Sequence, residues 1–210
     1  GIRDHCVTGV QTCALLLPLL PIGSSGSYAI ALSFAATLLA VDFCYYWQHR
    51  INHETKLFWA FHLVHHSGQQ MNLTTSFRLN WVTPLVSPLF YTPAALLGAP
   101  VLFIAAGLAL NLLYQFWLHT TLVPRLGFLE GIINTPSAHR VHHGSNEEYL
   151  DKNYGGILMI WDRIFGTYAR ERDDVPLRFG VTTGHAGYNP IRLVFYGFLD
   201  LFRGRLHSKG

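Results

Sequence analysis

Eight of the twelve histidines stand in three short clusters whose spacing suits metal binding. The first cluster is an HxxxH pair, and the other two repeat the pattern HxxHH: His49 and His53; His62, His65 and His66; His139, His142 and His143. On a helix, offsets of three and four residues place side chains on one face, within roughly 100° of arc. Neutral imidazole binds zinc, copper, iron and nickel. One metal accepts at most about six ligands, so eight imidazoles predict two metals.

Four further polar residues lie in otherwise apolar segments near these clusters. Asp42 precedes His49 by seven residues and so lies on nearly the same helical face. We expect it either to hold an imidazole or a water, or to hydrogen-bond another helix. Asn111, Gln115 and His119 follow at steps of four, a stripe that normally faces a site or a partner helix. His119 is a candidate ninth ligand, and Asn111 and Gln115 are candidates for supporting the ligands; the alternative is interhelical hydrogen bonding alone.

The first histidine cluster directly follows a segment long enough to cross a membrane. Residues 28–48 are apolar except for Asp42, and a bilayer core requires about 20 such residues. The aromatic residues 45–47 form an interfacial belt at the end of this segment. With a rise of about 1.5 Å per residue, a helix that continues through His49 and His53 places both at headgroup depth.

A second apolar stretch covers residues 82–117 and is interrupted only by Gly98-Ala99-Pro100. Two limbs of about 17 residues joined by a tight turn predict a membrane hairpin. Prolines indicate that the first limb is irregular: Pro84, Pro88 and Pro93. Both hairpin ends must emerge on one side, together with nearly all basic residues. The positive-inside rule makes that side, with the histidine clusters, the cytoplasmic one.

The remaining segments predict short helices outside the membrane. One covers residues 53–66 and stops at Ser67-Gly68. Thr135-Pro136 begins the second HxxHH helix, which Gly144 can close. Within the apolar segment 157–165, Trp161 and Asp162 are interpreted as core and cap residues. Residues 190–202 predict an amphipathic helix on the membrane surface, whose polar positions include Arg192 and Asp200. The isolated His185 and His207 are expected to be solvated or locally bonded.

Composition limits the class of protein. A chain of 210 residues with 50% hydrophobic and 13% charged residues suits one membrane domain. We place this domain at residues 16–210, and its histidine-rich core at residues 42–168. Residues 7–15 resemble the translation of a sequencing-library adapter, and we therefore treat residues 1–15 as an artefact or a disordered segment. The alternative is a signal-like run ending near Pro21. A net charge of +3 with scattered basic residues argues against nucleic acid. The fold prediction is an all-α integral membrane protein, with one span and a hairpin that carry a cytosolic, histidine-rich helical cap.

The histidine clusters, in this order and spacing, resemble the sterol desaturase and fatty acid hydroxylase superfamily of membrane diiron enzymes. Residues 53–168 most resemble its alkylglycerol monooxygenase branch, through FWAFHLVHHSGQQMNLTTSFR, NLLYQFWLHT, NTPSAHRVHHGSN and DKNYGGILMIWDRIFGTY. The resemblance implies that the eight clustered histidines bind two iron ions, with no catalytic side chain beyond the ligands. Some members carry an HxxxH pair on the second hairpin limb; here Gln115 replaces its first histidine and His119 remains.

The resemblance also implies O2-dependent hydroxylation of a lipid C–H bond, in an ether lipid, a sterol or a fatty acyl chain, with desaturation as the alternative. The implied reductant is tetrahydrobiopterin or an electron-transfer protein. A rival reading is a non-catalytic heme- or metal-binding membrane protein, but paired single histidines would leave the HxxHH triplets unused. A zinc hydrolase is a second rival, and zinc sites of that kind usually stop at three protein ligands and a water.

Overall fold

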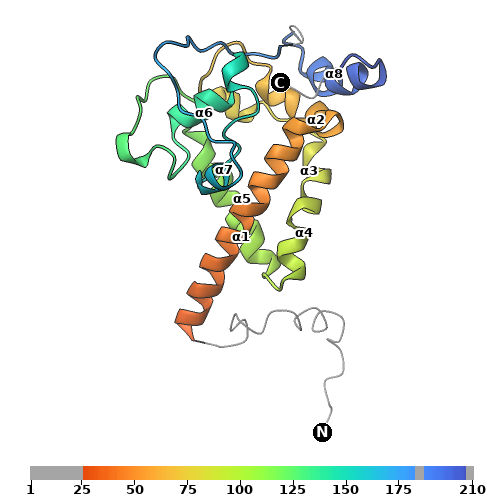
Figure 1. Cartoon of the computed structure of the whole chain (residues 1–210). Coiled ribbons are helices and arrows are strands. Elements are labelled where there is room, and N and C mark those ends of the chain that lie inside the picture. Colours follow the sequence, from red (N-terminus) through yellow and green to blue (C-terminus); the bar gives the residue numbers. More distant parts are fainter. Residues whose placement is uncertain (1–25, 183–186, 207–210) are drawn as a thin grey trace.

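The computed structural model describes residues 26–182 and 187–206, and regular structure in these residues is helical apart from three isolated β-bridges (Figure 1). The α-helices are α1 (Ser27–Glu54), α2 (Lys56–His66), α3 (Thr83–Val86), α4 (Pro88–Leu96), α5 (Val101–Phe116), α6 (Pro136–His142), α7 (Ile160–Ile164) and α8 (Pro190–Phe202). Three short 3-10 helices join them: η2 (Leu73–Phe77), η3 (Gly127–Leu129) and η4 (Glu147–Tyr149). The all-helical prediction is confirmed. Residues 1–15, His185 and His207 lie outside the described residues.

Helix α1 is the central helix, against which α2, α4 and α5 pack. It continues through His49 and His53 as expected. Among the described residues it is the one helix long and apolar enough to cross a bilayer. Thr55 then adopts an extended conformation (φ −120°, ψ 132°) that ends α1, and α2 begins at the next residue. Because of this break, α2 packs back against the end of α1 and brings the second histidine cluster to the first.

The predicted hairpin is present as α3 and α4, a turn, and α5, and both limbs lie beside α1 (Figure 1). Its first limb is irregular as predicted: Pro84 and Pro88 begin two separate helices, and Pro93 lies inside α4. Gly98 has a φ of 94° in the turn, which a residue with a Cβ rarely adopts. With 16 residues, α5 is about 24 Å long and therefore shorter than a bilayer core of about 30 Å.

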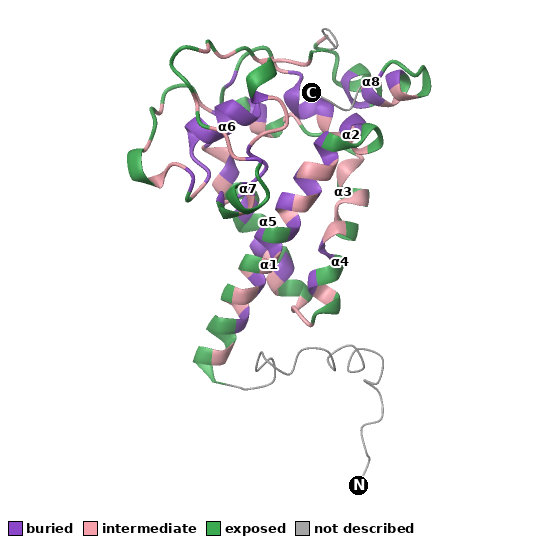
Figure 2. Cartoon of the chain, viewed as in Figure 1, coloured by how far each residue is buried: buried purple, intermediate pink, exposed green. Residues whose placement is uncertain are grey.

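Burial divides the molecule into two parts (Figure 2). In the histidine-bearing part, α6 is entirely buried, and the end of α1 buries the residues that face the histidines, among them His49 and His53. In the other part, large apolar side chains on α1, α4 and α5 face outward: Ile30, Leu32, Leu89, Leu96, Leu102 and Leu113 are all more than half exposed. Exposed apolar area of this extent on neighbouring helices is typical of a surface that contacts lipid or another protein.

Helix α8 has the predicted bounds and packs on α2. A Cβ on Gly197 would lie 2.6 Å from the Ala60 carbonyl oxygen, so glycine permits this close approach. Arg192 is exposed as predicted, but Asp200 is on the packed face, where its carboxylate pairs with Arg205 at 3.0 Å. The outer face carries apolar residues instead: Ile191, Phe195, Leu199 and Phe202.

Candidate metal centre

Nine histidines converge between α1, α2, α6 and the segment that follows α5. Their nitrogens form two groups in which the ligand atoms lie within 4.8 Å of one another. The five-histidine group comprises His49, His53, His62, His66 and His142, and the four-histidine group comprises His65, His119, His139 and His143. The structure therefore brings together all eight clustered histidines and the candidate ninth, His119. Eight of the nine are buried, and His62 is half-buried.

Each HxxHH motif contributes to both groups rather than to one. Residues four apart share a group, as His62 and His66 do in α2. The middle histidine of each motif belongs to the group opposite that of its two neighbours in the motif. His142 of α6 therefore joins His62 and His66 of α2. The two groups are neighbours, since the rings of His66 and His143 stack with centroids 4.3 Å apart. Two short helices thus supply a pair of adjacent sites without any change in helical geometry.

The histidines of α2 and α6 are neutral at physiological pH. Burial lowers the pKa of His65, His66 and His142 well below the usual value, because a charged imidazolium loses its hydration there. Neighbouring histidines lower each pKa further, since positive charges so close repel one another. Neutral imidazole is the form that binds metal.

Backbone carbonyls orient three of the rings. Nδ1 of His49 lies 2.9 Å from the Tyr154 carbonyl oxygen, and Nδ1 of His142 lies 3.0 Å from that of Lys152. Nδ1 of His119 likewise lies 2.9 Å from the carbonyl oxygen of Gln115. A carbonyl only accepts, so each Nδ1 carries the proton and each Nε2 keeps its lone pair. No amino-acid type is needed to provide a carbonyl, and the sequence therefore gave no signal for Tyr154 or Lys152.

The Nε2 lone pairs of these oriented rings point at other imidazoles. Nε2 of His49 lies 3.0 Å from Nε2 of His62, and Nε2 of His142 lies 3.1 Å from that of His66. In the other group, Nε2 of His119 lies 2.9 Å from Nε2 of His139. Nitrogen lone pairs that converge in this way are typical of ligands arranged around a shared cation.

Four further ring nitrogens are buried with no hydrogen-bond partner among the described residues: His53 Nε2, His65 Nδ1, His139 Nδ1 and His143 Nε2. Leaving a buried polar group unpaired costs about 1–3 kcal/mol, and both histidine groups contain such nitrogens. Neither group includes a carboxylate or a cysteine from the described residues. An all-imidazole donor set suits iron, copper or zinc. The residues therefore fit two metal ions, one in each group.

Asp42 and the polar stripe on α5 form one hydrogen-bonded network. Asn111 Nδ2 donates to the Asp42 carboxylate at 3.1 Å, and Gln115 Nε2 donates to Asn111 Oδ1. The Tyr45 hydroxyl donates to Gln115 Oε1 at 2.8 Å. The contact from Asp42 to α5 is the interhelical hydrogen bond that was one of its two expected roles. Through its backbone carbonyl, Gln115 also reaches the candidate ligand His119.

The loop that carries the Lys152 and Tyr154 carbonyls is held by two buried aspartates. Asp162 accepts from the backbone amides of Tyr154 and Gly155, at 2.7 Å each. Asp42 accepts from Trp161 Nε1 at 2.9 Å and from two more amides of the same loop. Trp161, expected in the core, is half-buried. Asp162, expected as a cap, is instead fully buried inside α7 and accepts from amides outside that helix. Burial raises the pKa of the Asp162 carboxyl, and these hydrogen bonds oppose that shift.

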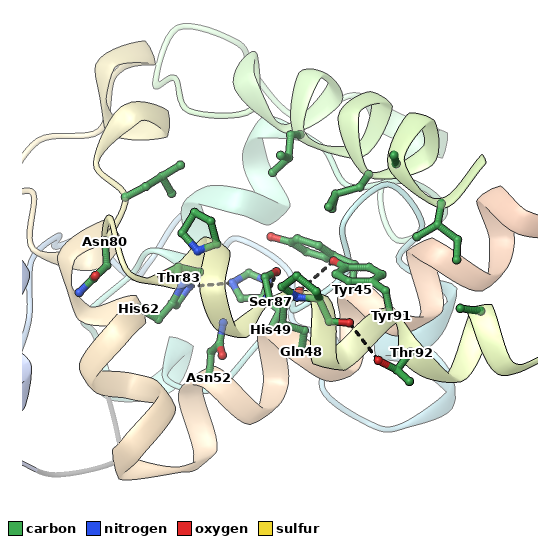
Figure 3. Close-up of a pocket in the computed structure, with 18 of the residues that line it drawn as sticks. Tyr45, Gln48, His49, Asn52, His62, Asn80, Thr83, Ser87, Tyr91 and Thr92 are labelled. Atoms are coloured by element: carbon green, nitrogen blue, oxygen red, sulfur yellow. Dashed lines mark hydrogen bonds between the residues drawn. The ribbon is translucent and has the colours of Figure 1, made fainter. Parts of the chain in front are cut away.

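A cavity of about 600 Å³ leads to the five-histidine group between α1, α3, α4 and α5 (Figure 3). His49 and His62 form part of its wall, which explains why the His62 ring is only half-buried. Away from the histidines the wall is apolar and includes Ala95, Ile104 and Leu108. The cavity is therefore a chamber that suits a hydrocarbon chain and that opens onto the candidate metal centre.

Comparison with known proteins agrees with this arrangement. The sequence pattern of the fatty acid hydroxylase family matches residues 34–167, which hold all nine histidines, and the chain belongs to that family. No solved structure matches the chain significantly.

Several relatives are named for reactions on lipids. The chain is similar to alkylglycerol monooxygenases from Homo sapiens, with 45% identity over 80% of this chain and 37% of the relative, and from Danio rerio, with 56% identity over 65% and 30%. It is also similar to ornithine lipid hydroxylase OlsE from Rhizobium tropici, with 32% identity over 67% of this chain and 43% of the relative. The chain spans about a third of the length of the alkylglycerol monooxygenases it matches.

Proposed function

We propose that this protein is a membrane-bound diiron oxidoreductase that uses O2 to hydroxylate a C–H bond of a lipid. The observation that carries the proposal is the convergence of nine histidines in two groups, one of which borders an apolar cavity through His49 and His62. The nine histidines are the proposed ligands. Bound iron would supply the activation of O2 that an unactivated C–H bond requires.

The chain's own part in this reaction is to position the ligand rings and to admit the lipid substrate. The carbonyls of Lys152, Tyr154 and Gln115 fix three ligand rings, and Asp42 and Asp162 hold the loop that supplies two of those carbonyls. The cavity admits a hydrocarbon chain to the side of the centre formed by His49 and His62. Because these groups position the ligands instead of reacting, no further catalytic side chain is assigned.

We propose an ether lipid as the first candidate substrate, with a sterol or a fatty acyl chain as the alternative. The alkylglycerol monooxygenase relatives support this order, and the ornithine lipid hydroxylase supports the wider class of lipids. Desaturation would use the same centre, and the position of the substrate carbon would decide between the outcomes. The proposed reductant is tetrahydrobiopterin for an ether lipid, or an electron-transfer protein otherwise.

The reaction is tested by oxygen uptake in membranes that contain the iron-loaded protein. With an alkylglycerol as substrate, we expect uptake that depends on tetrahydrobiopterin, together with cleavage of the ether bond. Sterol and acyl lipids of matched chain length are the comparison substrates. Turnover of these lipids alone, without tetrahydrobiopterin, would replace the ether-lipid proposal with the alternative. No uptake with any lipid would contradict the proposed enzyme.

We also propose that α1 spans the membrane, that the hairpin of α3, α4 and α5 enters it from the same side as the histidines, and that this side is cytoplasmic. The exposed apolar residues on these helices support the membrane contact, and the basic residues near the histidines support the cytoplasmic assignment.

Cysteine labelling tests this topology. Gln70 and Glu148 are exposed residues on either side of the hairpin in sequence, both in the histidine-bearing part. In a chain without its native cysteines, Gln70→Cys and Glu148→Cys are expected to react with an impermeant reagent only after the cytoplasmic face is opened. Ser27→Cys, at the other end of α1, serves as the control and should show the opposite accessibility. Opposite labelling of Gln70→Cys and Glu148→Cys would contradict the hairpin.

A further inference from the structure

The cavity wall contains three side-chain amides, and one of them makes no hydrogen bond within the described part of the chain. Gln48 is satisfied on both sides, since its Nε2 donates to Ser87 Oγ at 2.7 Å and its Oε1 accepts from the Tyr91 hydroxyl at 2.8 Å. Asn80 is satisfied too, because its Nδ2 donates to the Val194 carbonyl at 3.0 Å and its Oδ1 accepts from a backbone amide. Asn52 is only 8% exposed and lines the same cavity, but its side-chain amide makes no hydrogen bond to the other described residues and opens to the cavity instead.

The position of Asn52 is as informative as its lack of a partner. It lies on α1 between the candidate ligands His49 and His53, three residues after the first. His62, whose ring also opens to the cavity, lies nearby in the same wall (Figure 3). The Asn52 amide opens to the cavity, so it is available to hydrogen-bond a group that enters the cavity and lies beside the five-histidine group.

The rest of the cavity indicates which part of a ligand reaches Asn52. The walls from α4 and α5 are mostly apolar, with Ala95, Val101 and Leu108 among their residues, and they would hold the hydrocarbon chain. The oxygen-bearing end of a lipid would then lie at the histidine end. An amide Nδ2 donates hydrogen bonds, and an ether oxygen only accepts them.

We infer that Asn52 is a positioning residue that donates a hydrogen bond to an oxygen atom on or next to the lipid carbon that is oxidised. The inference rests on the proposed function and deepens it, because it assigns the substrate class: a lipid with an ether or hydroxyl oxygen near the reacting carbon. A plain methylene in the middle of an acyl chain has no such acceptor. A site built to hydrogen-bond its ligand discriminates strongly against an analogue that lacks the acceptor.

Binding to the iron-loaded full chain without O2 tests this inference, because no turnover occurs there. The probes are 1-O-hexadecylglycerol and its analogue with a methylene in place of the ether oxygen. The unsubstituted protein is expected to bind the ether at least about tenfold more tightly than the analogue. Asn52→Leu is expected to lose that preference while keeping its affinity for the analogue, which reports an intact cavity. Gln69→Leu also replaces a side-chain amide by leucine, but at an exposed position outside the cavity, and it should keep the preference.

An unchanged preference in Asn52→Leu would overturn the inference, as would equal weakening of both ligands. If Asn52→Leu binds neither ligand, Asn52→Ala is measured instead, because it removes the amide without adding bulk. The ratio of its affinities for the ether and for the analogue then decides. Failure of the proposed function looks different: the unsubstituted protein would bind the ether in preference to the analogue and oxidise neither once O2 and the reductant tetrahydrobiopterin are both added. Oxidation with no preference for the ether would contradict the role of Asn52 alone.

Discussion

Replacing His143 with alanine is expected to remove one of the two metal ions and to abolish turnover. His143 belongs to the four-histidine group, so the change leaves three nitrogens there. His53→Ala leaves four nitrogens in its own group, which is enough for many protein metal sites. Metal analysis of protein made with ample iron should therefore give about two ions per chain for the unsubstituted protein and for His53→Ala, and about one for His143→Ala.

Turnover should fall at least about a hundredfold in both variants, because losing even a supporting contact to a ligand costs roughly 10–100-fold. All first-row metals must be counted together, since zinc binds such sites more tightly than ferrous iron and can replace it during overproduction. His185→Ala and His207→Ala are the controls, as both histidines are isolated in the sequence, and both variants should keep their metal and their activity. One ion per unsubstituted chain would rule out a two-metal centre.

The sequence was sufficient to predict which side chains converge. Both groups consist of histidine alone among the described residues, and the histidine spacing survives folding because α1, α2 and α6 are regular helices that begin and end near the predicted residues. Thr135 illustrates this, since its hydroxyl accepts from the Ala138 amide at 3.1 Å and caps α6 as predicted. Such local signals depend only on neighbouring residues, and they can therefore be read without a tertiary structure.

The division of the histidines between two groups could not be predicted in the same way. Helical spacing places all three imidazoles of an HxxHH motif on one face, but that face is wide enough to border two sites. His65 groups with His119, whose Nε2 lies 3.2 Å from Nε2 of His65, while His66 belongs to the other group. His119 comes from a different segment of the chain, so this pairing depends on the tertiary structure. Asp200 shows the same limit, because its burial follows from the docking of α8 on α2 and not from the pattern of α8 itself.

Arg140→Ala is expected to destabilise the histidine-bearing part of the fold severely. Arg140 lies on α6 between two candidate ligands, and its guanidinium forms two hydrogen bonds with the Glu171 carboxylate, at 3.0 and 2.6 Å. It also donates to the carbonyls of Thr120 and Val123 at 3.1 and 2.8 Å. The Arg140 and Glu171 side chains are 7% and 16% exposed. Removing one partner of a buried ion pair costs about 3–5 kcal/mol, a large part of a typical total of about 5–15 kcal/mol.

Thermal unfolding of the metal-free protein in detergent measures this effect without the stabilisation that bound metal adds. The midpoint should fall by roughly 10 °C for Arg140→Ala. Arg140→Lys should recover only part of it, since an ammonium cannot make the two parallel bonds of a guanidinium. Arg125→Ala is the matched control: Arg125 pairs with Asp173 at the surface, where the side chains are 45% and 87% exposed, and solvent screens such pairs. Equal midpoints for Arg140→Ala and Arg125→Ala would show that Arg140 does not hold the segment after His119 against α6.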